Sequence, residues 1–209
     1  MLPSWWKFET GNLELMQANW AIILAAGSSR RMGSQKLLMP FGDKTIIETV
    51  VDQVLNSQVN GVVVVLGADH EKVRQTLDDR PVKFCHNEDH EKGMFSSIIC
   101  GLRSIPTDAE AALIYLGDQP GIPPAVTNAV IEAYNEELYG IVIPVHMHRR
   151  GHPLLVDLKY RRQIENLDLE QGLRALRHHF PQDVLEVEVD EPGILVDIDT
   201  PEDYKKATK

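Results

Sequence analysis

Short apolar runs alternate with amphipathic segments from Trp20 onward. The apolar runs are rich in β-branched residues and too short for most helices, which predicts strands buried on both faces, as in a parallel sheet. These expected strands cover residues 20–25, 61–66, 82–85, 111–116 and 140–143.

The segments between these runs have the periodicity of helices. After Thr45, a candidate N-cap, apolar residues recur every three or four positions up to Leu55. Further helices are expected over 93–105, 124–138 and 168–179. Alternating strands and helices predict an α/β fold with a single doubly wound, mostly parallel sheet and helices on both faces. We expect one domain over 19–209, preceded by an N-terminal extension over 1–18 that either docks or is disordered.

Composition and charge restrict the class of partner. The 209 residues carry a formal net charge of −10. Such a balance argues against nucleic acid or an anionic membrane as a partner, because both would be repelled. No apolar run is as long as a membrane span, and the first seventeen residues lack the apolar core of a signal peptide. We therefore expect a cytoplasmic protein.

The loop after the first expected strand contains candidate phosphate-binding chemistry. Small residues at 25–29 let the backbone approach a ligand closely, and Arg31 and Lys36 supply charges for phosphate oxygens. Lys36 stands three positions after Gly33 and is followed by leucine, which does not fit a P-loop. The spacing of Gly27 and Gly33 does not fit a dinucleotide fingerprint either.

The segment 24–36 matches the pattern LAAG-x-S-x-R-M-G-x-x-K, with Arg31 at the arginine position of the motif. This pattern resembles the signature of nucleotidyltransferases with a glycosyltransferase-A-like fold, and within them the molybdenum cofactor cytidylyltransferases. The resemblance implies that Arg31 and Lys36 are catalytic and neutralise the triphosphate. An opening Leu-Ala-Ala-Gly, rather than the Leu-Ala-Gly-Gly of related guanylyltransferases, favours CTP. Nucleotide contacts are implied for Leu24, Ala25, Ala26, Gly27, Ser28, Ser29, Arg31 and Lys36.

Two acidic segments could hold a metal. Asp118 follows the expected strand 111–116 within Gly-Asp-Gln-Pro, and a carboxylate there suits Mg²⁺. If 196–199 is extended, Asp197 and Asp199 face the same side. Both segments resemble family metal motifs, which implies Mg²⁺ as cofactor, Asp118 as a catalytic residue, and Asp118, Asp197 and Asp199 near the metal; which of the last two is the ligand stays open. Thr200 and Pro201 read as a helix start.

The remaining site residues are assigned mainly by resemblance. Asn87, Gly93 and Ser97 occur at spacings similar to those of the family, which implies nucleotide contacts, as does Gly67 more weakly. Arg150, Gly151 and His152 lie in the most basic stretch of an acidic chain. They resemble the segment that contributes to the pterin side, which implies acceptor binding, and Gln119 is assigned to the acceptor as well.

These observations predict a transferase that moves CMP from CTP to the phosphate of a molybdopterin-type acceptor and releases pyrophosphate. An acceptor phosphate is largely ionised at neutral pH, so no general base is required. Two alternatives stay open. GTP or a sugar or polyol phosphate could replace these substrates, or the chain could be a catalytically silent protein that binds and delivers the cofactor. A molybdoenzyme or delivery protein is a possible partner.

Overall fold

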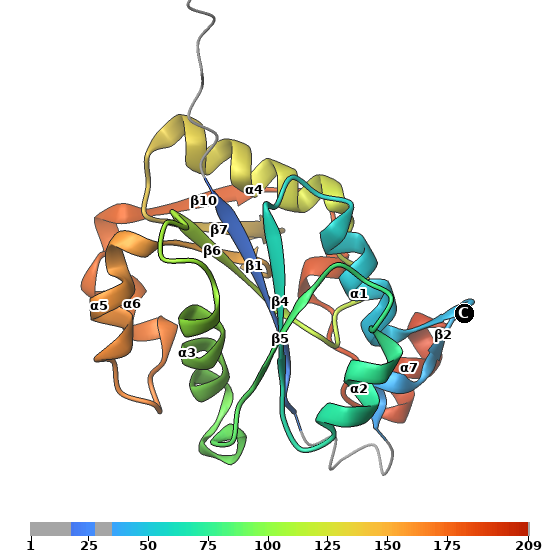
Figure 1. The fold of residues 1–209 in the computed structure, drawn as a ribbon. Coiled ribbons are helices and arrows are strands. Elements are labelled where there is room, and N and C mark those ends of the chain that lie inside the picture. Colours follow the sequence, from blue (N-terminus) through green and yellow to red (C-terminus); the bar gives the residue numbers. More distant parts are fainter. Residues whose placement is uncertain (1–17, 28–34, 209) are drawn as a thin grey trace, which may run out of the picture.

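The computed structural model describes residues 18–27 and 35–208. The extension up to residue 17 and the assigned site residues Ser28, Ser29 and Arg31 lie outside the described residues. The described chain forms one central eight-stranded sheet and a small two-stranded hairpin (Figure 1).

The main sheet has the order β10-β7-β9-β6-β1-β4-β5, with β8 paired to β7. Its strands are β1 (Asn19–Ala25), β4 (Gly61–Leu66), β5 (Lys83–His86), β6 (Ala111–Leu116), β7 (Ile141–His146), β8 (Arg149–Arg150), β9 (Leu154–Asp157) and β10 (Val184–Glu188). The hairpin consists of β2 (Pro40–Phe41) and β3 (Lys44–Thr45).

Most of the sheet is parallel, as the apolar runs predict. Strand β1 pairs in parallel with both β4 and β6, and β10 pairs in parallel with β7. Strand β9 runs in the opposite direction, between β6 and β7. The expected α/β fold with a mostly parallel sheet is confirmed, with one antiparallel strand in its interior that the sequence did not reveal.

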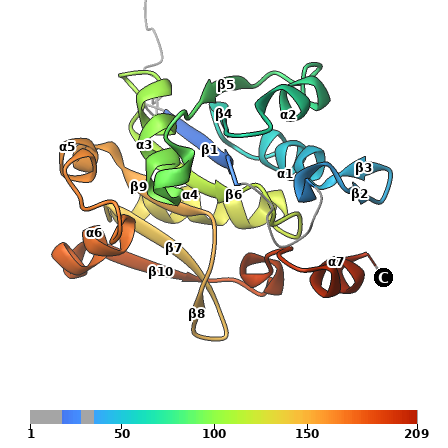
Figure 2. The same ribbon diagram turned by 90° about the horizontal axis from the view of Figure 1, so that it is seen from below.

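Helices cover both faces of the sheet (Figures 1 and 2). Successive residues of β1 point to opposite faces, so Ala21 and Ile23 belong to one core cluster and Ile22 to the other. The first cluster packs against α1 (Ile46–Leu55), α2 (His70–Thr76), α4 (Pro124–Glu137) and α7 (Pro201–Ala207). The second packs against α3 (Met94–Ser104), α5 (Arg161–Glu165) and α6 (Leu173–His179). Five 3-10 helices lie in connections: η1 (Lys36–Leu38), η2 (His90–Lys92), η3 (Leu158–Tyr160), η4 (Pro181–Asp183) and η5 (Pro192–Leu195).

Capping explains where two helices begin. Thr45 and Thr200 each accept a hydrogen bond from a backbone N–H three residues on, and an acidic side chain at that position bonds back to the cap. Both caps were expected. No helix in the described part of the chain is long and apolar enough to cross a membrane.

One expected element is wrong in its extent. The helix expected over 168–179 begins only at Leu173, because Gly172 before it has φ of 55°, outside the helical region. The segment 196–199, whose extended form was a condition for Asp197 and Asp199 to face one side, pairs with no strand among the described residues. Instead, Ile198 is fully buried and its N–H donates to the carbonyl of Asp118, which fixes this segment against the loop after β6.

Candidate functional site

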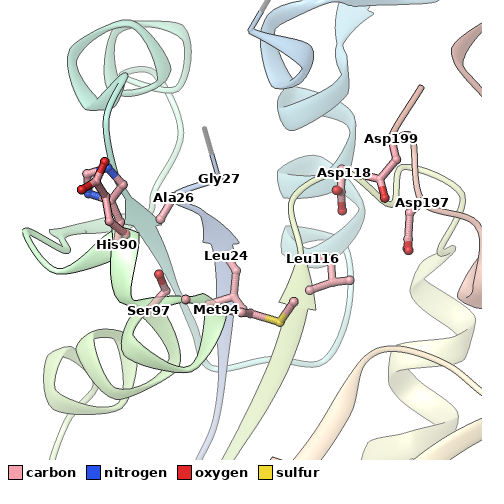
Figure 3. Close-up of a pocket in the computed structure, with 12 residues that line it drawn as sticks. Leu24, Ala26, Gly27, His90, Met94, Ser97, Leu116, Asp118, Asp197 and Asp199 are labelled. Carbon is pink, nitrogen blue, oxygen red and sulfur yellow. The ribbon is translucent and has the colours of Figure 1, made fainter. Parts of the chain in front are cut away.

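A cavity of about 430 Å³ opens at the carboxyl ends of β1 and β6 (Figure 3). Ligands of such sheets bind at this edge, where loops and helix N-termini meet. In Figure 3 three aspartates gather on one side of the cavity, while His90 and Ser97 face it from the other side. Its lining is Leu24, Ala26, Gly27, His90, Glu91, Gly93, Met94, Ser97, Leu116, Asp118, Asp197 and Asp199.

Lys36 joins the two acidic segments. Its Nζ donates to Asp118 Oδ2 at 2.5 Å and to Asp199 Oδ1 at 2.7 Å. Lys36 opens η1, which is anchored by the buried side chain of Leu37, and Asp118 follows β6 directly. The sequence placed all three residues at the phosphate end of the site, and the fold brings them into contact.

The charges around Lys36 keep it protonated. Burial by itself would lower the pKa of Lys36, but the charges of Asp118 and Asp199 and their hydrogen bonds outweigh burial and raise it. The ammonium group is therefore a fixed cation at the mouth of the β1 loop. Such a group can neutralise phosphate oxygens without exchanging a proton.

Asp197 has different surroundings from Asp199. Its Oδ1 accepts a hydrogen bond of 2.5 Å from Gln119 Nε2. Burial raises the pKa of Asp197, and the charge of Asp118 raises it further. Gln119 itself is buried, does not line this cavity and holds Asp197, while its assignment to the acceptor stays a prediction.

The carboxylates fit a divalent metal that is completed by its substrate. Among the described residues, no three His, Cys, Asp or Glu side chains converge closely enough to form a site by themselves. Asp118 and Asp199, however, both direct an oxygen at one cation, the Lys36 ammonium. Mg²⁺ is commonly held by one or two carboxylates together with substrate phosphates and water, so this donor set is suitable.

The start of α3 forms the opposite wall. Gly93 has φ of 105° and ψ of 172°, a conformation open almost only to glycine, and this turn aims the helix N-terminus at the cavity. Ser97, one turn later, lines the cavity although it is largely buried. Free N–H groups at such a terminus suit an anion or a polar ligand edge.

Asn87, expected to contact the nucleotide, instead organises this wall. Its side chain is buried, and its Nδ2 donates to Ser96 Oγ at 2.8 Å and to Ser97 Oγ at 2.9 Å. Its Oδ1 accepts from the N–H of Asp89. Asn87 does not line the cavity, but it holds the hydroxyl group of Ser97, which does.

Some residues of the turn after β1 line the cavity, and others pack behind it. Leu24, Ala26 and Gly27 line the cavity, whereas Ala25 is buried and does not. A Cβ on Gly67 would come within 2.4 Å of the Ala26 carbonyl oxygen. Gly67 therefore permits close packing behind the turn, and the nucleotide contact expected of it stays a prediction.

The acceptor residues lie beside a second cavity of about 720 Å³, which shares Gly93 and Met94 with the first. Arg150, Gly151 and His152 line this cavity together, as their assignment to one site requires. Arg150 is paired with Glu186 at 2.5 Å. A Cβ on Gly151 would clash with Ile194 of η5, so this glycine holds the hairpin close to that turn.

Several lining residues were not found from the sequence. His90, Glu91 and Met94 line the first cavity, and Arg174 and Arg177 line the second. The first three flank Gly93, so their nearness to that expected contact was the signal available. The two arginines carry no local signature, because they reach the cavity through the packing of α6 on the sheet.

Comparison with known proteins places this geometry in a family. The chain is 28% identical to the molybdenum cofactor cytidylyltransferase of Escherichia coli, over 90% of this chain and 95% of that protein. It is 27% identical to the nicotine blue oxidoreductase of Paenarthrobacter nicotinovorans, over 87% and 92% of the two chains. The crystal structure of Rv0371c from Mycobacterium tuberculosis superimposes with a TM-score of 0.83 and 26% identity, covering 92% and 97%.

The model of the MobA-like NTP transferase domain matches residues 21–184, which include the β1 turn, Asp118 and the residues assigned to the acceptor. That match spans most of the chain, the whole lining of the second cavity, and the lining of the first cavity except Asp197 and Asp199. The chain therefore belongs to the MobA-like NTP transferases, a family of nucleotidyltransferases.

Proposed function

We propose that the chain is a cytoplasmic, Mg²⁺-dependent enzyme that transfers CMP from CTP to the phosphate of a molybdopterin-type acceptor. An oxygen of the acceptor phosphate would attack the α-phosphorus of CTP, forming the new P–O bond. The bond from the α-phosphorus to the bridging oxygen would break, and pyrophosphate would leave with that oxygen and its electron pair. A molybdoenzyme or delivery protein would be the downstream partner.

The observation that carries this proposal is the contact of Lys36 with both Asp118 and Asp199. It places one fixed cation and two carboxylates at the carboxyl edge of β6, beside the turn after β1. A triphosphate needs neutralising charge, and a metal needs hard oxygen ligands; this arrangement supplies both.

In the proposal Asp118 and Asp199 hold Mg²⁺. When bound, the metal supplies positive charge to the phosphate oxygens of the nucleotide. Lys36 binds the same phosphates, and Gln119 orients Asp197 at the edge of the site. Gly93 and Ser97 bind the nucleoside end. Because the acceptor phosphate arrives ionised, these residues act by positioning and charge neutralisation, without a general base.

The proposed preference for CTP rests on the Leu-Ala-Ala-Gly sequence of the turn after β1. Ala26 lines the cavity and is nearly buried, and the Ala26 backbone is held against Gly67. A methyl group at this position therefore takes up space where a ligand base would approach. GTP remains the main alternative, because the same turn would accept either nucleotide through its backbone.

Pyrophosphate release measured with each of the four NTPs and molybdopterin tests the proposal. We expect release with CTP, and loss of at least about 100-fold in the Asp118→Asn variant, since a group that binds charge in the transition state is removed. Asp43→Asn, an exposed residue next to the β2–β3 turn, is the matched control and should be unchanged.

Other outcomes would replace the proposal. Release with GTP alone would make the chain a guanylyltransferase, and release with a sugar or polyol phosphate would change the acceptor. Binding of cofactor without release by any nucleotide would favour a delivery protein. Normal turnover of Asp118→Asn would remove Asp118 from the metal site.

A further inference from the structure

The second cavity combines an apolar floor with an open rim. Its floor is formed by side chains from three strands of the sheet and from α3 and α6: Phe95, Ile98, Ile114, Ile143, Leu154 and Leu173. A sugar or polyol would lose hydrogen bonds to water against such a surface without regaining them. A flat, weakly polar ring would bury apolar area there at no such cost.

The rim of the same cavity is strongly positive. Four cations line it against a single acid, Glu170, in a chain whose net charge is −10. Two of the four cations are neutralised nearby: Lys92 pairs with Asp89 at 2.8 Å, and Arg150 pairs with Glu186 at 2.5 Å. The rim therefore depends on the other two for its uncompensated charge.

Those two are Arg174 and Arg177, one turn apart on the same side of α6. Neither has an ion pair with any acid among the described residues. Burial lowers the pKa of Arg177, and the positive charges of Arg150 and Arg174 lower it further, against the weaker opposing effect of Glu186. Like charges gathered at a partly buried rim are unfavourable by themselves, and a bound anion would relieve the repulsion.

The two cavities adjoin each other. His152 lines the second cavity, and its ring lies near enough to both Asp118 and Arg177 for each to affect its pKa. Gly93 and Met94 line both cavities. A ligand in the second cavity can thus extend to the nucleotide phosphates while its remainder stays on the apolar floor.

We propose that Arg174 and Arg177 bind the negative charge of a ring-bearing phosphorylated acceptor, whose flat ring packs on the apolar floor of the second cavity. This inference rests on the proposed function, whose molybdopterin-type acceptor is such a ring compound, and it disfavours the alternative of a small sugar or polyol phosphate. It also assigns the acceptor to residues of α6 in addition to the β8 hairpin.

The binding test uses probes that need no turnover. Flavin mononucleotide carries a flat ring and a phosphate, riboflavin carries the ring alone, and ribose 5-phosphate carries the phosphate alone. We expect the wild-type chain to quench flavin mononucleotide fluorescence on binding, and to bind the other two at least about tenfold more weakly. The Arg174→Gln/Arg177→Gln variant should bind flavin mononucleotide at least about tenfold more weakly as well.

Two control variants separate a specific role from general damage. Arg162→Gln removes an exposed arginine of α5 outside this cavity and should leave binding unchanged. Arg177→Lys keeps the positive charge and should therefore bind flavin mononucleotide more tightly than the Arg174→Gln/Arg177→Gln variant does. In turnover assays, the double variant should raise KM for the acceptor while KM for the nucleotide and kcat stay close to the wild-type values.

The binding and turnover results test the role of the two arginines and the proposed nucleotidyl transfer separately. No flavin mononucleotide binding by wild type, equal binding of riboflavin, or unchanged binding by the double variant would overturn it. If binding depends on the arginines but no nucleotide gives pyrophosphate, the cavity assignment stands and the proposed reaction fails. If CTP turnover occurs and the double variant keeps the wild-type acceptor KM, the reaction stands and the arginine assignment fails.

Discussion

Lys36 Nζ lies 2.5 Å from Asp118 Oδ2, although the two residues are 82 positions apart in the sequence. The contact exists because β1 and β6 are neighbouring parallel strands, so the segments that follow them emerge at the same edge of the sheet. Asp199 reaches the same ammonium from the C-terminal part of the chain. Three separate segments thus share one cation, and this shared contact gives the first prediction.

Removal of the lysine should improve metal binding while it abolishes turnover. In Lys36→Ala the two carboxylates lose their shared cation, so Mg²⁺ no longer competes with it and should bind several-fold more tightly by calorimetry. Activity should fall by at least about 100-fold, because phosphate neutralisation is lost. Lys44→Ala, which removes a different lysine–aspartate pair, is the control. Unchanged or weaker Mg²⁺ binding by Lys36→Ala would show that the metal lies elsewhere.

Asn87→Ala should weaken both the fold and nucleotide binding. The change leaves Ser96 and Ser97 without their shared donor inside the protein, which costs about 1–3 kcal/mol of unfolding free energy. KM for the nucleotide should rise because Ser97 is no longer held. Urea denaturation and initial rates measure the two effects. Asn128→Ala, which removes an exposed acceptor of the Gln58 N–H, should change neither by a comparable amount.

Gly93→Ala and Gly27→Ala should differ in stability although both glycines line the same cavity. The φ of 105° at Gly93 strains any residue with a Cβ, at a cost of about 1–3 kcal/mol. A Cβ on Gly27 meets no atom of the described residues within 4 Å, and Gly27 has no positive φ. Thermal unfolding should therefore show a lower Tm for Gly93→Ala alone. Equal Tm values for the two variants would contradict the assigned backbone conformation.

His152 should make the protein less stable as the solution is acidified. Burial lowers the pKa of His152 to about 4, and the charge of Arg177 also lowers it, against the opposing effect of Asp118. The unfolded chain binds this proton near pH 6.5, so the free energy of unfolding falls as the pH drops from about 6.5 toward about 4. The loss from this group is about 2 kcal/mol at pH 5 and grows further until the pH falls below about 4.

Denaturation curves at several pH values test the histidine. His152→Gln should reduce the fall in stability between neutral and acidic pH, because the group that titrates is gone. His179→Gln, at an exposed position at the end of α6, should keep the wild-type dependence. An unaltered pH dependence in His152→Gln would mean that His152 is not held neutral in the fold.

Sequence patterns predicted most strands and two helix starts, because these elements depend on interactions between residues close together in the chain. The apolar runs gave the parallel strands, and Thr45 and Thr200 gave two helix starts through side chains that cap their own neighbours. Interior strand β9 was missed because its four residues show neither a long apolar run nor a helical period. The boundary of α6 was missed because Gly172 acts through its backbone conformation.

The sequence predicted the site residues that directly follow strands. It did not predict the contacts that depend on tertiary packing. Lys36 and Asp118 were placed in one pocket because each follows an expected strand and each lies in a motif that resembles the family, and the structure brings them into contact. Asn87 and Gln119 were expected to contact ligand, yet both are buried and hold other side chains in place. Arg177 was missed because its neighbour Arg150 lies on a distant hairpin, which only the folded chain brings near.

The reversed direction of β9 has a consequence for how the two substrates are recognised. Parallel strands present the residues that come after them at the ligand edge, and the nucleotide side is built in this way from β1 and β6. An antiparallel strand presents at that edge the residues that come before it, so the β8 hairpin enters from the opposite chain direction. The hairpin can thus vary in length and charge without altering the register of β1 or β6. The lining of the second cavity can therefore change while the strands that support the first cavity stay as they are.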